Sequence, residues 1–217
     1  MDGLIAPQRH YPGLNLLEEE PHSRRERVEK GIFGFWVFLM SDAVVFALLF
    51  ALFGTSLMAT DGGPDLARVV KLLPAFIETL LLLTSSFTFG MASIELKRTH
   101  RFTRRHQNRM VLWLLATWAL GIAFLGMEVN DFATMAQEGA TPDRSFFVSA
   151  YTALVGTHGL HVLTGVVWLP VLLLQLAALG LDRPLKVNLV RLSLFWHFLD
   201  IVWIGIFSVV YLQGALR

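Results

Sequence analysis

The chain has 217 residues and no cysteine. Disulfides, iron–sulfur clusters, covalently attached c-type haem and copper centres built on thiolates are therefore excluded. Charged residues are also scarce, at 16%, whereas 54% of the residues are hydrophobic. Soluble domains carry about a quarter charged residues, so this composition is typical of an integral membrane protein. The formal net charge of +1 gives no basis for a nucleic-acid partner.

The first thirty residues are polar and contain three prolines, at Pro7, Pro12 and Pro21. We predict that residues 1–30 form a tail that is mobile or lies on the surface. The first apolar run begins too far along the chain, and is too long, for a removable signal peptide. It is expected to remain as a membrane anchor.

Five apolar runs follow the tail, and each reaches the roughly 20 residues that a helix needs to cross a bilayer. They cover about residues 31–53, 72–96, 110–135, 145–179 and 191–212. The fourth is longer than the hydrocarbon core requires, so it is expected to tilt, protrude or bend near Pro170. No alternating ten-residue pattern indicates a β-barrel. We predict an all-α integral membrane bundle of five transmembrane helices over residues 31–214.

The orientation follows from the positions of Lys and Arg. Fourteen lie in the tail, the second connector and the third linker, and four lie on the opposite side. Cytoplasmic segments carry the excess of basic residues, so the N-terminus is predicted to be cytoplasmic and the C-terminus outside.

Ionisable side chains inside the spans are few, and each is costly in lipid unless it faces protein, water or a partner. They are Asp42, Glu78, Glu128, Asp131, His158, His161, His197 and Asp200. At 1.5 Å per residue, the polar groups of the fourth and fifth spans fall at about the same depth. Adjacent helices joined by a short linker usually pack antiparallel, so the His158/His161 face is predicted to meet the His197/Asp200 face or to share a neighbour with it. Glu128 and Asp131 lie nearer the outside and are expected to approach the fourth span.

The three histidines within the spans admit three interpretations. With the carboxylates they could ligate a metal, since imidazole and carboxylate suit iron, copper or zinc. Two of them on facing helices could hold a b-type haem. They could also belong to a polar network that joins helices by hydrogen bonds worth about 0.6 kcal/mol each, without any ligand. A catalytic haem–copper core would need more histidines than these three.

No cation shares the span of Asp42. It is paired with another helix, kept neutral, or part of a proton-binding or lipid-facing site.

Five motifs carry a family resemblance. They are Gly31 to Asp42 (GIFGFWVFLMSD), Glu78 to Ser86 (ETLLLLTSS), Gly126 to Glu128 (GME), Gly156 to Val162 (GTHGLHV) and Trp196 to Trp203 (WHFLDIVW). Together they resemble subunit III of the haem-copper oxidases, in order, over about residues 31–214. The five-span form is most similar to the bacterial ubiquinol oxidase branch, and the cytochrome c oxidase branch is the alternative.

The resemblance implies a non-catalytic subunit of a proton-pumping terminal oxidase in the bacterial cytoplasmic membrane. Such a subunit binds no cofactor or metal of its own and has no catalytic residue. It packs beside subunit I, which carries the haems and copper, in a complex with subunits II and IV. It also holds phospholipids in a cleft between its first two helices and the remaining bundle, and it supports proton uptake.

The resemblance also assigns roles to the polar residues. Asp42 falls where the family has its intramembrane carboxylate, a Glu in many cytochrome c oxidases. Glu128, His158, His161, His197 and Asp200 match the structural polar core, which we expect to include Glu78 and Asp131. The competing function, from a different class, is a membrane electron carrier that binds haem b or a metal.

Overall fold

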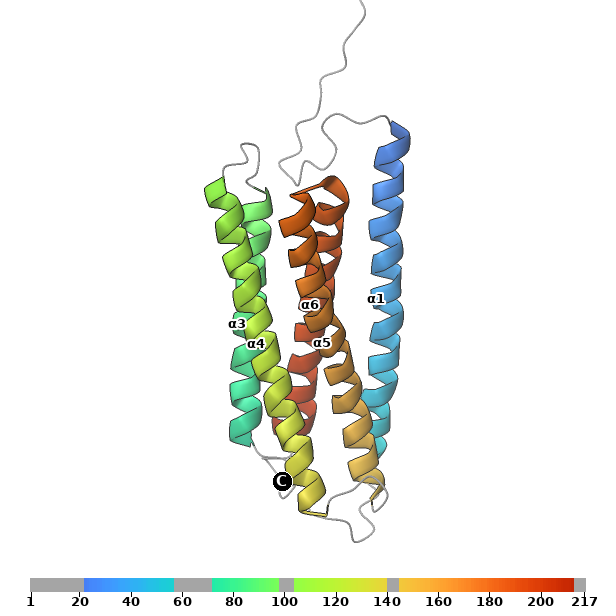
Figure 1. The fold of residues 1–217 in the computed structure, drawn as a ribbon. Coiled ribbons are helices and arrows are strands. Elements are labelled where there is room, and N and C mark those ends of the chain that lie inside the picture. The colour runs from blue at the N-terminus through green and yellow to red at the C-terminus, as the bar shows by residue number, and fades with distance from the viewer. Residues whose placement is uncertain (1–21, 57–71, 98–103, 140–144, 213–217) are drawn as a thin grey trace, which may run out of the picture.

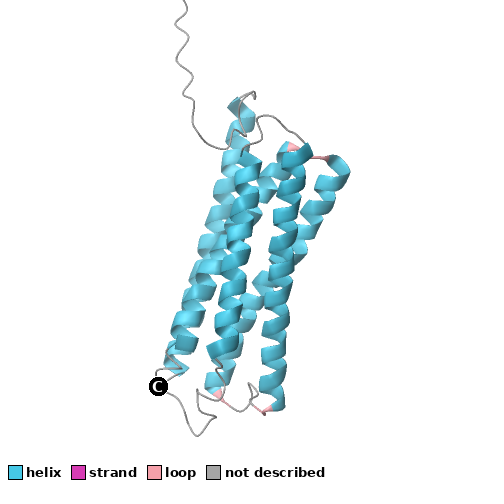
Figure 2. Ribbon diagram, turned by 90° about the vertical axis from the view of Figure 1, so that its left-hand side faces the viewer, coloured by secondary structure: helices cyan, strands magenta, loops and turns pink. Residues whose placement is uncertain are grey.

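The computed structural model describes residues 22–56, 72–97, 104–139 and 145–212. The regular structure in these ranges is helical throughout (Figure 2). The helices are α1 (His22–Ser56), α3 (Leu72–Lys97), α4 (Arg104–Gln137), α5 (Phe146–Leu179) and α6 (Arg183–Ile206), and a π-helical segment, η2 (Phe207–Leu212), continues α6. Five helices in the described ranges are long and apolar enough to cross a membrane. The predicted all-α bundle with five spans is therefore confirmed.

The boundaries of the helices were predicted unevenly. Helices α3 and α5 match the predicted spans 72–96 and 145–179 to within a residue. By contrast α1, α4 and α6 begin at His22, Arg104 and Arg183, well before their apolar runs. Residues 22–30 of the predicted tail are thus helical, as are the ends of the basic connector and of the last linker. An apolar run shows only the part of a helix that lies within the lipid. Arg, Lys and Glu also favour helix, so the helix can continue into the polar segments on either side.

Other sequence predictions fall on parts of the chain that the structure does not describe. These parts are residues 1–21 of the tail, the loop that contains Asp61 to Pro64, residues 98–103 of the basic connector, and residues 140–144.

Helix α5 is helical from Phe146 to Leu179, with Pro170 in its interior. It ends at Gly180, whose φ of 77° suits a residue without a Cβ atom. The Gly180 N–H donates to the Leu176 carbonyl at 3.1 Å, which satisfies one of the last carbonyl groups of the helix. The sequence therefore gives this helix its full predicted length and a defined end.

Helices α5 and α6 occupy the middle of the bundle (Figure 1). On one side α1 packs against α5 and α6, and on the other side α3 and α4 pack closely together and contact α6 and α5, respectively. The first two spanning helices therefore do not form a unit apart from the other three. The family resemblance implied such a unit beside a lipid cleft; the structure instead packs α3 against α4 and α6.

Hydrogen bonds between side chains connect α3 to its two neighbours. The indole N–H of Trp196 donates to Ser85 Oγ at 3.0 Å, and that of Trp203 donates to Thr79 Oγ1 at 3.1 Å. The hydroxyl groups of Thr88 and Thr117 are 2.8 Å apart between α3 and α4. These buried groups have no water to bind in a bilayer, so the bonds fix how the helices are rotated against one another.

The ring of Trp196 also requires small residues on two further helices. A Cβ atom on Gly121 of α4 would lie 2.9 Å from this ring, and one on Gly165 of α5 would lie 3.0 Å from it. Both distances are shorter than ordinary contacts between carbon atoms. Glycine at these positions therefore lets α4, α5 and α6 enclose the tryptophan.

We predict that Thr79→Val destabilises the bundle, because valine keeps the shape of threonine but leaves the Trp203 indole N–H without an acceptor. The expected loss is about 0.6 kcal/mol and at most about 1.7 kcal/mol, the range measured for bonds between membrane helices. Unfolding in mixed micelles of increasing denaturing detergent measures it.

Thr84→Val is the matched control, because Thr84 is exposed and donates only to Leu80 within α3. Equal stability of the two variants would contradict a role for the Trp203 bond.

Candidate functional site: the polar groups between the helices

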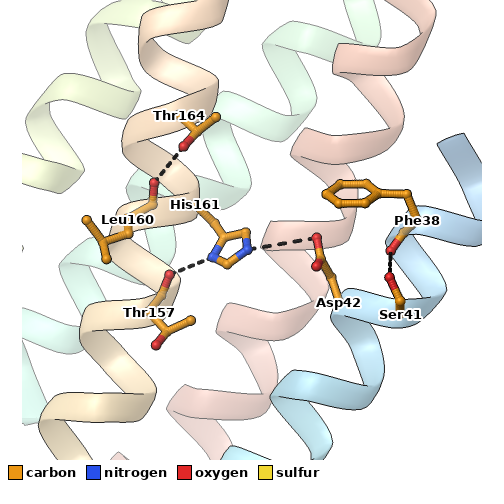
Figure 3. A network of polar contacts seen from close by, with 7 residues as sticks. All are labelled: Phe38, Ser41, Asp42, Thr157, Leu160, His161 and Thr164. Atoms are coloured by element: carbon orange, nitrogen blue, oxygen red, sulfur yellow. Dashed lines mark hydrogen bonds and ion pairs between the residues drawn. The ribbon is translucent and has the colours of Figure 1, made fainter.

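Asp42 lies opposite a histidine from another helix. His161 Nε2 of α5 is 3.8 Å from Asp42 Oδ2 of α1 (Figure 3). The side chains are 15% exposed for Asp42 and 26% exposed for His161, so the pair is only partly screened from its surroundings. Of the alternatives for Asp42, pairing with another helix is thus the one that the geometry supports. We call these two residues the Asp42 pair.

The proton on His161 can be placed from its other contact. Its Nδ1 atom is 2.7 Å from the carbonyl oxygen of Thr157, which can only accept, so Nδ1 carries a hydrogen (Figure 3). Nε2 is then an acceptor in the neutral ring and faces a carboxyl oxygen. The contact is attractive only when a further proton lies on His161 or on Asp42. At 3.8 Å the two atoms are too far apart for a direct hydrogen bond, so a bridging water or a small movement would complete it.

His158, one turn earlier on α5, lies in a fully buried aromatic enclosure. Its ring is 5.1 Å from the ring of Trp203 and 5.8 Å from that of Phe124, measured between centroids. Its Nε2 atom is 3.2 Å from the carbonyl oxygen of Leu199 on α6, to which it donates. This bond confirms that α5 and α6 pack together at the level of the histidines.

His197 and Asp200 lie on a different face of α6. His197 Nδ1 is 2.7 Å from Ser86 Oγ of α3, and Asp200 also hydrogen-bonds with Ser86. The predicted meeting with the His158/His161 face is therefore wrong in its detail. Residues 197 and 200 are about half a helical turn away from Phe195 and Leu199, which contact α5. Depth was predicted correctly, but the rotation of α6 turns the two polar groups toward α3.

The start of α3 and the end of α4 lie at the end of the bundle that is lowest in Figure 1, and the remaining predicted carboxyl groups belong to these segments. Glu78 of α3 and Glu128 and Asp131 of α4 line one small space together with Tyr151 of α5 and Tyr211 of η2. We call these three acidic residues the carboxyl cluster. The two tyrosine hydroxyl groups are 2.8 Å apart.

Glu128 lies directly against α5, as predicted. A Cβ atom on Gly159 would be 2.5 Å from Glu128 Oε1 and 2.6 Å from Oε2, so the carboxyl group occupies the space that a side chain would need. The second glycine of the Gly-Thr-His-Gly motif therefore makes room for a carboxyl group from another helix. The first one, Gly156, meets only the Phe132 ring, at 4.0 Å.

Several polar partners were missed by the sequence analysis. They are the indole and hydroxyl pairs between α3 and α6, the Tyr151–Tyr211 pair, and Glu95, whose Oε2 atom is 2.9 Å from His106 Nδ1 at the opposite end of the bundle. Serine, threonine, tyrosine and tryptophan are common in membrane helices as packing residues. Their sequence pattern alone therefore gave no sign that these particular ones are paired.

The geometry bears on the two cofactor interpretations. Within the described ranges, no three or more His, Cys, Asp or Glu side chains converge as a metal would require. For haem b the candidates were His197 with His158 or with His161. His158 is enclosed by aromatic rings, His161 faces Asp42, and His197 faces Ser86 of α3. What the arrangement can do is join helices and hold protons.

We predict that Gly159→Ala lowers the yield and thermal stability of the protein, because the new methyl group displaces the Glu128 carboxyl. Overpacking of this kind costs about 1–3 kcal/mol. Gly156→Ala is the control and should be close to neutral. Shortening the acid in the double variant Gly159→Ala/Glu128→Asp should recover part of the loss. Additive effects in a double-mutant cycle would contradict the direct contact.

Comparisons with known proteins agree with the family resemblance. A family model described as cytochrome c oxidase subunit III matches residues 19–215. The cytochrome bo(3) ubiquinol oxidase subunit 3 of Pseudomonas aeruginosa is 44% identical over 185 residues, which cover 85% of this chain and 86% of that protein. The subunit of the same name from Pseudomonas putida is 41% identical with the same coverage, and the quinol oxidase subunit 3 of Bacillus subtilis is 42% identical over 84% of this chain and 87% of that protein.

The match is therefore not confined to a motif or to one helix. It spans all five membrane helices and the polar residues between them. From the sequence motifs, the five-helix bundle and these relatives together, the chain belongs to the cytochrome c oxidase subunit III family.

Proposed function

We propose that this chain is the non-catalytic subunit III of a proton-pumping haem-copper ubiquinol oxidase. The observation that carries the proposal is that relatives 37–44% identical over about 85% of this chain are named as subunit 3 of quinol oxidases. The haems and copper belong to subunit I, and the chain works in a complex with subunits I, II and IV. Its internally paired histidines suit a subunit that stabilises a catalytic partner.

The same proposal includes the place of the protein in the cell. The chain is a multi-pass membrane protein, and we assign it to the bacterial cytoplasmic membrane with its N-terminus in the cytoplasm and its C-terminus outside. The support is the excess of Lys and Arg, fourteen against four, in the segments at the N-terminal side. Phospholipids cover the many apolar side chains exposed on the bundle, of which α1 has the largest share.

The Asp42 pair supplies the functional part of the proposal. The pair joins α1 to α5, and both of its side chains are partly exposed. The two side chains attract each other only when one of them carries a further proton. A group of this kind can take up a proton from its surroundings and pass it on, or bind the polar part of a lipid. We propose that it supports proton uptake by the neighbouring catalytic subunit during turnover.

Purification of the complex through a tag on this chain tests the proposed function. We expect co-purified polypeptides that carry haem and copper, and oxidation of ubiquinol but not of reduced cytochrome c. After dissociation, the isolated subunit should show no stoichiometric Soret absorption and no stoichiometric metal.

Two results would contradict the proposal. Haem or metal that stays with the isolated subunit would favour the electron carrier. A co-purified subunit II with thiolate copper ligands, together with oxidation of cytochrome c, would favour the cytochrome c oxidase branch.

We predict that Asp42→Asn leaves the haem content and the initial rate of the complex unchanged but shortens its active lifetime during turnover. Asparagine has a similar shape to aspartate but cannot bind and release a proton. His161 therefore loses the group with which it can share a proton. Ser41→Ala is the matched control, because the Ser41 hydroxyl donates only to Phe38 of the same helix, at 2.6 Å (Figure 3). Inactivation of both variants at the rate of the unmodified complex would rule out the proton role of Asp42.

A further inference from the structure

Two glutamates of the carboxyl cluster are deeply buried. Glu78 is 1% exposed and Glu128 is 5% exposed. In the described part of the chain, neither carboxyl group has a hydrogen-bond partner for either of its oxygen atoms. Buried oxygen atoms without partners cost free energy, and buried charges without partners cost much more. The described side chains therefore leave these two groups to be satisfied in another way.

The charges that face the cluster are all of one sign. The titratable side chains lining the space are Glu78 from α3, Glu128 and Asp131 from α4, Tyr151 from α5 and Tyr211 from η2. Among these described lining residues there is no Lys, Arg or His. Ionised Glu78 and Glu128 would repel each other, and each would also be repelled by Asp131. The nearest histidine on α5, His158, is directed to Leu199 and the Trp203 ring instead.

Water and metal ions fit the cluster poorly. The space between the side chains is too narrow for a water molecule. Ca²⁺ takes six to eight oxygen ligands, and Mg²⁺ usually keeps several of its waters. The described residues hold no convergent group of three or more potential ligands of the kind that binds a metal. A proton needs no such space, and it converts a carboxylate into a group that can donate to the other carboxyl.

We propose that Glu78 and Glu128 form a buried proton-binding site, in which at least one carboxyl group is held as the neutral acid. Protonation forms an O–H bond on one carboxylate oxygen, and the proton comes from the aqueous phase at this end of the bundle. Asp131 lines the same space and is only partly buried, so in this proposal it is the group through which the proton enters and leaves.

This site is distinct from the Asp42 pair. No residue of α1 lines it, and the side chains come from α3, α4, α5 and η2. The inference concerns this chain alone and does not depend on the electron donor of the complex. If the complex proved not to oxidise quinol, the proposed proton-binding site would not be affected. If the proton-binding site were disproved, the proposal for the Asp42 pair would not be affected.

Infrared spectroscopy of the intact complex tests the proposal, because neutral carboxylic acids have a carbonyl stretching band that carboxylates lack. The difference spectrum of the unmodified complex minus Glu128→Gln, or minus Glu78→Gln, should contain such a band, and it should shift in D₂O. Glu95→Gln is the matched control. Glu95 is also a buried glutamate, but it is bound to His106, so the substitution should remove no band of this kind.

Two further variants keep the test decisive if a glutamine variant does not assemble. Glu128→Asp and Glu78→Asp retain the acid and should move the band rather than remove it. Asp131→Asn should leave the band in place but slow its shift after transfer to D₂O.

The proposal is overturned if the band is the same in all glutamate variants and in the unmodified complex. It is also overturned if elemental analysis finds a stoichiometric cation that is lost in Glu128→Gln but kept in Glu95→Gln. An unchanged exchange rate in Asp131→Asn would overturn the role of Asp131 as the entry group.

Discussion

Backbone polar groups inside a bilayer must find their partners within the protein, and polar side chains are costly there without one; the structure follows from this constraint. The helices satisfy their own backbone, so the side chains decide which helices meet and how they are rotated. Several buried polar side chains find their partners on other helices: Ser85 for Trp196, Thr79 for Trp203, and the Leu199 carbonyl for His158. Apolar side chains also fill the interfaces, but they can make equivalent contacts with lipid. They therefore determine less than the polar groups which helices pack together.

Helix α6 has the central place because it offers different polar groups on different faces. Its backbone accepts a bond from α5 at Leu199, while its side chains bind α3 through Trp196, His197 and Trp203. Glycine residues on α4 and α5 let the Trp196 ring fit between them. The interior is therefore connected through α6. The three histidines within the spans serve three separate interfaces: α5 with α6, α5 with α1, and α6 with α3.

Depth along the membrane could be predicted from the sequence, but rotation could not. Counting residues placed the polar groups of the fourth and fifth spans at about the same depth, and the structure brings His158 of α5 to the Leu199 carbonyl of α6. Counting also indicated that Glu128 approaches the fourth span. It could not tell which neighbour a given face of α6 meets, because that depends on all the contacts of the helix together. His197 was therefore assigned to α5, whereas its partner Ser86 lies on α3. The early starts of α1, α4 and α6 were missed because the helix bounds were predicted from apolar runs, and these helices extend beyond their apolar runs.

The Asp42 pair differs from the other polar contacts because it belongs to the least buried helix. Helix α1 contacts only α5 and α6 to any large extent, and its contacts include pairs of aromatic rings, such as those of Phe46 and His161, 5.3 Å apart. Aromatic contacts tolerate sliding and rotation better than a polar pair does. A single proton on Asp42 or His161 thus decides whether the middle of α1 is attracted to α5 or merely packed against it. A change in protonation at this pair would alter how firmly α1 is held, whereas a change at the carboxyl cluster would act on the interfaces of α3, α4 and α5 and leave α1 in place.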